Sequence, residues 1–331
     1  MKHGANIYKY AKKLTCDSSE IIDFSSNINS YIPDINISLT NEMLVKYGDS
    51  SYKNLKNAIA TKYQIKKKQI ALFNGATSAI FELFKSLKET TVYLYAPLYG
   101  EYEKAAKLTN KKIIKINRFE KMREEPTKNS IVVFVNPSTP DGKYYHLEHL
   151  FSMWSKHKCT VIVDESFLEF ESLKPVRKKI NNYNKLYIVQ SFTKFHCCAG
   201  VRVGALFSHK SNIKRFTSPL WHLSSFDTAF LTQRLQDSTF NKESKELHKV
   251  HKKELFDILK SSNLFTKIYK SDTNFFLVKS KKAQIIFQYL LEKKILVRTC
   301  DSFDFLDKNH LRFAVKDSTA HDSLKKAFQR I

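Results

Sequence analysis

"SIVVFVNPSTPDGKYYHLEHLFSMWSKHKCTVIVDESF", residues 130–167, is the stretch that decides the fold of this 331-residue chain. It contains two apolar runs, IVVFV at 131–135 and TVIV at 160–163, and an amphipathic segment between them at 147–157. Runs without polar alternation are typical of strands covered on both faces, and a helix between two of them is typical of a parallel connection. The stretch therefore predicts an α/β fold.

The same alternation continues on both sides of this stretch. Residues 77–89 carry an apolar stripe at helical spacing and predict a helix. Strand-like runs lie at 91–97, where Pro97 ends the run, and at 111–117, 185–191 and 203–208. Short apolar strands separated by helices predict a mostly parallel sheet with helices on both faces.

A different pattern begins after about residue 235. A long charged helix is predicted first, and short strands and helices follow it: helix 241–262, strands 273–280, 295–300 and 310–316, and helices 283–294 and 322–330. This part predicts a smaller α+β unit. Residues 1–44 show no strand rhythm and are expected to pack against it. We therefore expect a large domain at 45–235 and a small domain made of 1–44 and 236–331.

The composition excludes several classes of protein. Hydrophobic residues make up 42% of the chain, too many for a disordered protein. No run reaches the ~18–20 apolar residues of a membrane span, and the first residues lack the apolar stretch of a secretory signal. The five cysteines are odd in number and form no CxxC pair, so neither a disulfide framework nor a zinc ribbon is expected. We expect a soluble, cytoplasmic protein.

The formal net charge is +24, and the positive residues are spread from end to end without an arginine-rich block. Ordinary surface lysine is the favoured interpretation. A field that attracts small anionic ligands comes second. Nucleic-acid binding comes third, and it leaves a basic nucleic-acid-binding protein without catalysis as an alternative of a different class.

Polar residues gather where the predicted strands end. Ligands of open α/β sheets bind beyond the carboxyl ends of the strands, so these residues are expected at one edge. A helix also begins near 75, and its free backbone N–H groups suit a phosphate. The residues concerned are Gly75, Ala76, Thr77, Asn136, Thr139, Asp164, Ser191 and Lys194.

A lysine beside a phosphate cradle and a buried carboxylate indicates pyridoxal 5′-phosphate. The lysine forms a Schiff base with the aldehyde of the cofactor, and the carboxylate keeps the pyridine nitrogen protonated. The neighbouring His196, Cys197 and Cys198 do not indicate a metal site, because three consecutive side chains rarely converge on one tetrahedral ion. No metal is expected, and the two cysteines are expected to fill core.

Ten short stretches, in order along nearly the whole chain, resemble the fold-type I aminotransferases in the branch of histidinol-phosphate aminotransferase and threonine-phosphate decarboxylase. They are HGANIY (3–8), DFSSNIN (23–29), KYGDSSYKNLKNAIA (46–60), NGATSAIF (74–81), NPSTPDG (136–142), DESFLEF (164–170), SFTKF (191–195), GVRVG (200–204), LVRTCDSF (296–303) and LRFAV (311–315).

The resemblance implies a role for each matching residue. Lys194 is the Schiff-base lysine, Asp164 pairs with the pyridine nitrogen, and Tyr99 stacks on the ring. The phosphate is bound at Gly75, Ala76, Thr77, Ser191 and Arg202, and Thr139 replaces an asparagine that hydrogen-bonds the ring oxygen. Tyr47 reaches the cofactor phosphate of a neighbouring subunit, which implies a homodimer. Arg298 and Arg312 bind substrate anions, and His3 and Asn29 lie in segments that close over the substrate.

Three features favour decarboxylation over amino transfer within this resemblance. They are the HGAN opening, the ILVRTCDSF stretch, and Phe167 where the aminotransferase has a tyrosine. The hypothesis is decarboxylation of O-phospho-L-threonine or O-phospho-L-serine to an amino-alcohol phosphate, as for the nucleotide loop of cobamides. Histidinol-phosphate aminotransferase activity is the alternative within the same class.

Overall fold

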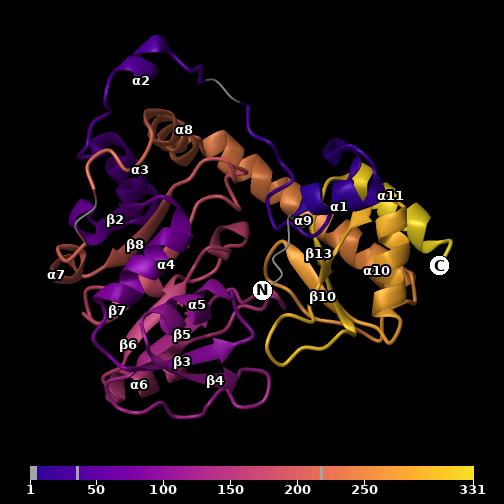
Figure 1. Cartoon of the computed structure of the whole chain (residues 1–331). Helices are drawn as coiled ribbons and strands as arrows, with labels where there is room; N and C mark the ends of the chain where they lie inside the picture. Colours follow the sequence, from indigo (N-terminus) through magenta and orange to yellow (C-terminus); the bar gives the residue numbers. More distant parts are fainter. Residues whose placement is uncertain (1–5, 35–36, 217–218) are drawn as a thin grey trace.

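The computed structural model describes residues 6–34, 37–216 and 219–331 (Figure 1). Within residues 37–216 the largest sheet has seven strands. Their spatial order is β2 (Ile70–Phe73), β8 (Gly204–Ser208), β7 (Leu186–Ser191), β6 (Thr160–Asp164), β5 (Ile131–Val135), β3 (Thr91–Ala96) and β4 (Lys112–Asn117).

The sheet is mostly parallel, as the sequence predicts. Strands β4, β3, β5, β6 and β7 pair in parallel, whereas β8 runs antiparallel to both of its neighbours. Strand β2 therefore runs in the same direction as the parallel strands. It was not predicted, because a four-residue IALF run directly before a helix carries too little periodicity to identify a strand.

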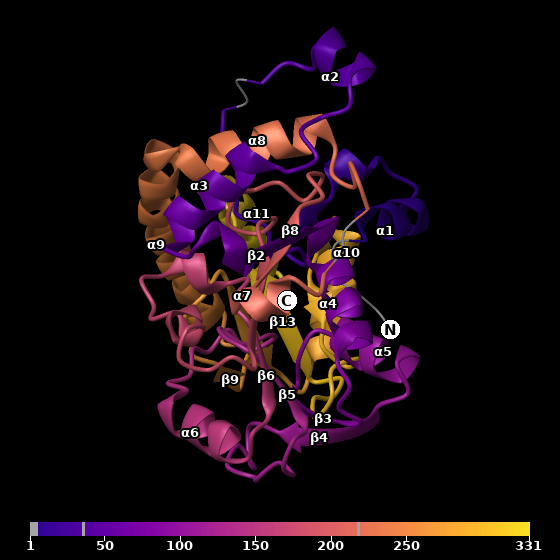
Figure 2. The ribbon, with the colours of Figure 1, turned by 90° about the vertical axis from the view of Figure 1, so that its left-hand side faces the viewer.

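Helices cover both faces of this sheet (Figure 2). Alternate residues explain why the strands are apolar throughout: Val132 and Phe134 pack on one face, Ile131 and Val133 on the other. The first face is covered by α3 (Lys53–Tyr63), α6 (Glu148–Lys156) and α8 (Ser225–Gln236), and the second by α4 (Gly75–Ser86) and α5 (Glu101–Leu108), with the short α7 (Lys210–Ile213) beside it.

A second, antiparallel sheet lies beside the first (Figure 1). Within residues 219–331 it contains four strands, in the order β12 (Arg298–Thr299), β13 (His310–Ala314), β10 (Phe275–Lys279) and β9 (Lys267–Ile268). Its apolar core is shared with α9 (Ser238–Ser261), α10 (Ala283–Glu292) and α11 (Ser318–Phe328). The long helix α9 runs from α8 towards this sheet.

The predicted strand at 295–300 is wrong as a single element. The chain forms β11 (Ile295–Leu296), which pairs with β1 (Ile22–Asp23), and then β12, which pairs with β13. The two halves join different sheets. An apolar run in the sequence does not indicate which strand each half pairs with. The β1–β11 pairing and the packing of α1 (Ile7–Leu14) against α10 bring the amino-terminal segment to the smaller unit. The proposed domain limits at 45 and 235 stay a prediction.

None of the helices in the described ranges is both long and apolar enough to cross a membrane.

Gly204 allows the start of α4 to lie against the sheet. A Cβ atom at this position would be 2.2 Å from the backbone nitrogen of Ala76 and 2.4 Å from the carbonyl carbon of Gly75. Real Cβ atoms do not approach backbone this closely, so only glycine fits here. The contact holds the first turn of α4 at the edge where β6 and β7 end.

We predict that Gly204→Ala lowers the free energy of unfolding by about 1–3 kcal/mol, because backbone has to move to admit the methyl group. Chemical denaturation measures this loss. Gly200→Ala is the matched control, since a Cβ atom there meets nothing within 4 Å. Equal stability of the two variants would contradict the packing role of Gly204.

Candidate active site

A cavity of about 350 Å³ lies at the edge of the large sheet where the parallel strands end. The segment 25–28, the small-sheet strands β12 and β13 and the first turn of α4 complete its wall. The structure brings together ten of the sequence-predicted site residues around it: Ala76, Thr77, Tyr99, Thr139, Asp164, Ser191, Lys194, Arg202, Arg298 and Arg312.

Lys194 lies three residues beyond the end of β7. Its Nζ donates a hydrogen bond to Ser191 Oγ at 3.1 Å. Removal from water lowers the pKa of the Lys194 ammonium, because burial disfavours the charged form, while the negative charge of Asp164 acts in the opposite direction. A lowered pKa makes the neutral amine, which is the nucleophilic form, more available.

Asp164 is the last residue of β6 and is buried. Tyr102 Oη donates to its Oδ2 at 2.8 Å, and the backbone N–H of Ser166 donates to its Oδ1 at 2.9 Å. These two bonds fix the carboxylate at the cavity wall. Burial, and then the carboxylate itself, raises the pKa of Tyr102 well above its ordinary value, so the phenol remains a hydrogen-bond donor.

The first turn of α4 has the features of an anion site. Asn74, the residue before the helix, makes no side-chain hydrogen bond to the helix N–H groups. The guanidinium of Arg202 lies beside Gly75, where a Cβ atom would be 2.5 Å from Nη2. Thr77 Oγ1 is 3.3 Å from Tyr99 Oη. Backbone donors, hydroxyl groups and a guanidinium therefore converge on one end of the cavity.

Two arginines face each other on the opposite wall. Arg298 of β12 and Arg312 of β13 are direct cross-strand partners, and both are buried. Arg312 donates to Thr139 Oγ1 at 3.2 Å and to the Ser25 carbonyl at 3.0 Å, while its Nε has no hydrogen-bond partner among the described residues. Burial lowers the pKa of Arg312 to about 10, and the charge of Arg298 acts in the same direction.

The structure does not bring every predicted residue to the cavity wall. Asn29 lies behind Lys194: its backbone N–H donates to the Lys194 carbonyl at 2.9 Å, and its side chain donates to the carbonyl of Phe195 at 2.9 Å and to Ser244 Oγ. Tyr47 is 81% exposed and stacks on Trp221. His3 lies outside the described residues.

Two residues of the site were missed from the sequence. Tyr102 is the second residue of α5, and its ring packs edge-to-face on that of Tyr99, which lies before the helix, at 6.5 Å between centroids. Ser166 is the second residue after Asp164, where its N–H can reach the carboxylate. The spacing was visible in the sequence, but only the packing of α5 against β6 identifies the bond to Asp164.

Comparison with known proteins identifies the family. The model of the aminotransferase class I and II family matches residues 4–331. The chain belongs to this family. Its members are pyridoxal-phosphate-dependent enzymes, and pyridoxal 5′-phosphate is the cofactor of this chain as well.

Curated relatives carry two kinds of name. The chain is 28% identical to the adenosylcobalamin biosynthesis bifunctional protein CobDQ of Leptospira interrogans, over 100% of this chain and 41% of that protein. It is 26% identical to histidinol-phosphate aminotransferase of Flavobacterium psychrophilum, over 92% and 91% of the two chains. It is 24% identical to threonine-phosphate decarboxylase of Salmonella typhimurium, over 99% and 96%.

Solved structures of the same two kinds share the fold. Histidinol-phosphate aminotransferase from Clostridium acetobutylicum superposes with a TM-score of 0.82 at 24% identity, over 94% and 98% of the two chains. L-threonine-O-3-phosphate decarboxylase from Porphyromonas gingivalis gives 0.81 at 20%, over 94% and 99%. Histidinol-phosphate aminotransferase from Sinorhizobium meliloti, in complex with pyridoxal-5′-phosphate, gives 0.81 at 16%, over 98% and 95%.

The residues around the cavity fit the chemistry of this cofactor. An uncapped helix terminus with Arg202 beside it suits a phosphate. A buried carboxylate, held by two donors, suits a protonated ring nitrogen. An amine with a lowered pKa suits covalent attachment to an aldehyde. These three groups lie at the end of β6, just beyond the end of β7 and at the start of α4, along one edge of the sheet.

We predict that Tyr102→Phe weakens cofactor binding and lowers the free energy of unfolding by about 1–3 kcal/mol, because Asp164 loses a donor. Cofactor titration followed by absorbance, with thermal unfolding alongside, measures both effects. Tyr95→Phe is the control: Tyr95 is also buried and accepts a bond from Trp154 Nε1 at 2.8 Å, but it packs on the face of the sheet opposite α4 and α5. Equal cofactor affinity of the two variants would exclude a role of Tyr102 through Asp164.

Proposed function

We propose that this enzyme decarboxylates an O-phospho amino acid, O-phospho-L-threonine or O-phospho-L-serine, to an amino-alcohol phosphate. The observation that carries the proposal is the cross-strand pair of Arg298 and Arg312 at the wall of the Lys194 cavity. Like charges directly opposite each other are destabilising in a sheet. A substrate with both a carboxylate and a phosphate relieves the repulsion, since it supplies two anionic groups.

In this proposal the cofactor is held from three directions. Lys194 would attach to its aldehyde, Asp164 would keep a proton on the ring nitrogen, and Tyr99 would pack on the ring. The N–H groups at the start of α4, with Ser191 and Arg202, hold its phosphate. Thr139 reaches the ring oxygen through its hydroxyl, which also accepts a hydrogen bond from Arg312. When bound, the cofactor withdraws electrons from the substrate's α-carbon.

The apolar wall beside the site favours loss of carbon dioxide over amino transfer. Phe167 lines the cavity and packs edge-to-face on Phe275 at 5.2 Å between ring centroids. A phenylalanine at this position offers no hydroxyl to the cofactor. Lys194 would be the group that returns a proton to the α-carbon.

The choice between the two substrates rests on one methyl group. A methyl group in an apolar pocket is worth only about 1–3 kcal/mol of discrimination. The relatives named threonine-phosphate decarboxylase support phosphothreonine.

We also propose a homodimer in which Tyr47 of one protomer completes the phosphate site of the other. Helix α2 (Asn41–Val45) stands away from the body of the molecule (Figure 1). Large apolar side chains are exposed there and on the neighbouring loop: Leu39, Leu44, Val45, Tyr47, Leu220 and Trp221. An exposed apolar group of this size supports contact with a second copy.

We predict that the holoenzyme releases carbon dioxide from O-phospho-L-threonine or O-phospho-L-serine without any added 2-oxo acid. Product analysis by NMR identifies the amino-alcohol phosphate.

Arg312→Gln should lower kcat/KM by roughly 100-fold, since a charged hydrogen bond is worth about 1.5–3 kcal/mol. Phe167→Tyr should lower the ratio of decarboxylation to amino transfer, because it adds a hydroxyl to the apolar wall. Amino transfer from histidinol phosphate that depends on 2-oxoglutarate, with no carbon dioxide released, would replace the proposal by the aminotransferase alternative.

A further prediction concerns assembly. Val45→Asp should shift the protein from dimer to monomer at micromolar concentration, because it places a charge in the contact. Light scattering after gel filtration measures the mass. Val250→Asp is the control, since Val250 is exposed on α9 outside this group. A dimer that survives Val45→Asp unchanged would exclude this surface.

A further inference from the structure

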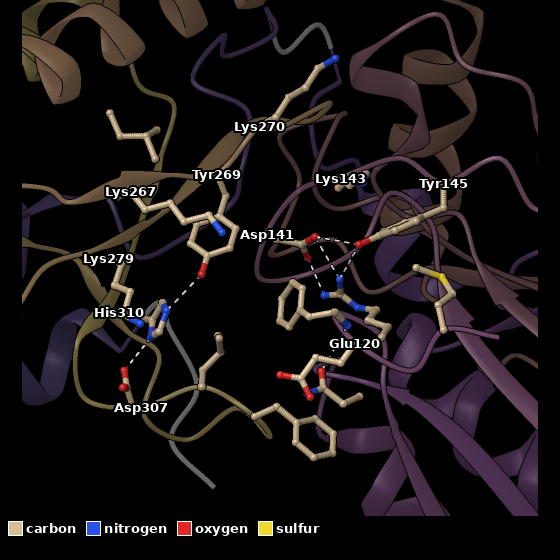
Figure 3. Close-up of a pocket in the computed structure, with 17 residues that line it drawn as sticks. Glu120, Asp141, Lys143, Tyr145, Lys267, Tyr269, Lys270, Lys279, Asp307 and His310 are labelled. Atoms are coloured by element: carbon tan, nitrogen blue, oxygen red, sulfur yellow. Dashed lines mark hydrogen bonds and ion pairs between the residues drawn. The ribbon is translucent and has the colours of Figure 1, made fainter. Parts of the chain in front are cut away.

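A second and larger cavity, of about 810 Å³, lies between the two sheets (Figure 3). None of the residues that line it lines the Lys194 cavity. In Figure 3 residues of the small sheet, such as Lys267 and His310, form one wall, and residues that follow β4 and β5, such as Asp141 and Lys143, form the other. Its volume is in the range of cavities that bind small molecules.

A row of basic side chains crosses the small-sheet wall of this cavity. Lys267 of β9 is the cross-strand partner of Lys279 in β10, and Lys279 is the partner of His310 in β13. All three line the cavity. Like charges directly opposite each other are unfavourable in a sheet. Lys267 and Lys279 are both exposed, so an anion from solvent can lie between them and relieve the repulsion.

The nearby carboxylates do not neutralise these lysines. Asp141 forms a buried ion pair with Arg118, and Asp307 accepts from His310 Nδ1 at 2.6 Å. Within the described residues, Lys267 and Lys279 form no ion pair, and neither does Lys143 on the opposite wall. Lys267 lies over the Tyr269 ring at 4.3 Å, and Lys143 lies over Tyr145 at 4.9 Å. Glu120, the remaining acid of the lining, is exposed, as are the three lysines, and it forms no ion pair with them among the described residues.

Aromatic rings lie beside the cations. Phe119 and Tyr269 are 6.2 Å apart between centroids, and both line the cavity. Phe305, also in the lining, is 48% exposed and has a φ of 62°. A bulky residue at positive φ is strained by about 1–3 kcal/mol. Because the Phe305 ring is half exposed, its burial does not offset this strain energy. An exposed ring at a strained position is consistent with a role in binding a ligand.

From these observations we propose that the second cavity binds a nucleotide. The phosphates lie on Lys267, Lys279 and Lys143, and the base stacks on the rings of Phe305 and Phe119. The lysines by themselves would bind any phosphate, and the aromatic rings by themselves would stack on any flat molecule. Only a ligand that combines a flat ring with phosphates uses both features. This inference does not rest on the decarboxylase proposal.

Calorimetric titration of the holoenzyme with ADP at low ionic strength tests the proposal, with inorganic pyrophosphate and adenosine as separate probes. ADP should bind more tightly than either probe, and its affinity should fall as salt is added. The double variant Lys267→Gln, Lys279→Gln should bind ADP at least tenfold more weakly, because it loses both charged contacts. Lys293→Gln is the matched control: Lys293 also lies over a tyrosine ring, that of Tyr289, but outside the cavity.

Phe305→Gly separates ligand binding from folding. Glycine relieves the backbone strain at this position, so the unfolding temperature should stay the same or rise, while ADP affinity falls roughly tenfold with the loss of one stacking ring. ADP binding that is absent, or that is equal in the double lysine variant and in Lys293→Gln, would overturn the proposal. Pyrophosphate binding as tight as that of ADP would contradict the role of the rings.

Discussion

The cavity chemistry depends on one constraint: the parallel strands of the large sheet end at the same edge. In the strand register Val135 is the partner of Asp164, and Gly204 is the partner of both Ser191 and Phe73. The ends of the parallel strands therefore lie close together along one edge: Asp164, which ends β6, is the partner of Val189, two residues before the end of β7. Lys194, Asp164 and the start of α4 come from distant parts of the sequence and meet because this register aligns them.

Basic side chains whose burial is unfavourable in the absence of a ligand lie at the same edge. Lys194 is desolvated, and Arg312 is buried and forms no ion pair among the described residues. Uncompensated buried charge is destabilising, so the protein gives up stability at this cavity. Anionic ligands offset this loss: the phosphate of the cofactor, and the carboxylate and phosphate of the proposed substrate, would pair with the surplus of positive charge.

The basic residues behind the net charge of +24 therefore fall into two groups. Most lysines are exposed and consistent with ordinary surface charge. A few basic residues lie directly opposite one another across strands: the exposed pair Lys267 and Lys279, and the buried pair Arg298 and Arg312. Composition does not distinguish the two groups, because both contribute one positive charge per residue. Strand register does, because it shows which cations lie opposite one another.

The sequence by itself determined the alternation of strands and helices and the polar residues that follow each strand. Both are local patterns: apolar runs such as IVVFV report burial on two faces, and Asp164 or Lys194 directly follows such a run. Tertiary structure alone decided the reversed direction of β8, the division of 295–300 between two sheets and the bond from Tyr102 to Asp164. It also decided the opposed arginines and the basic row of the second cavity. Each of these depends on which strand pairs with which, and that choice is made by contacts between residues far apart in the chain.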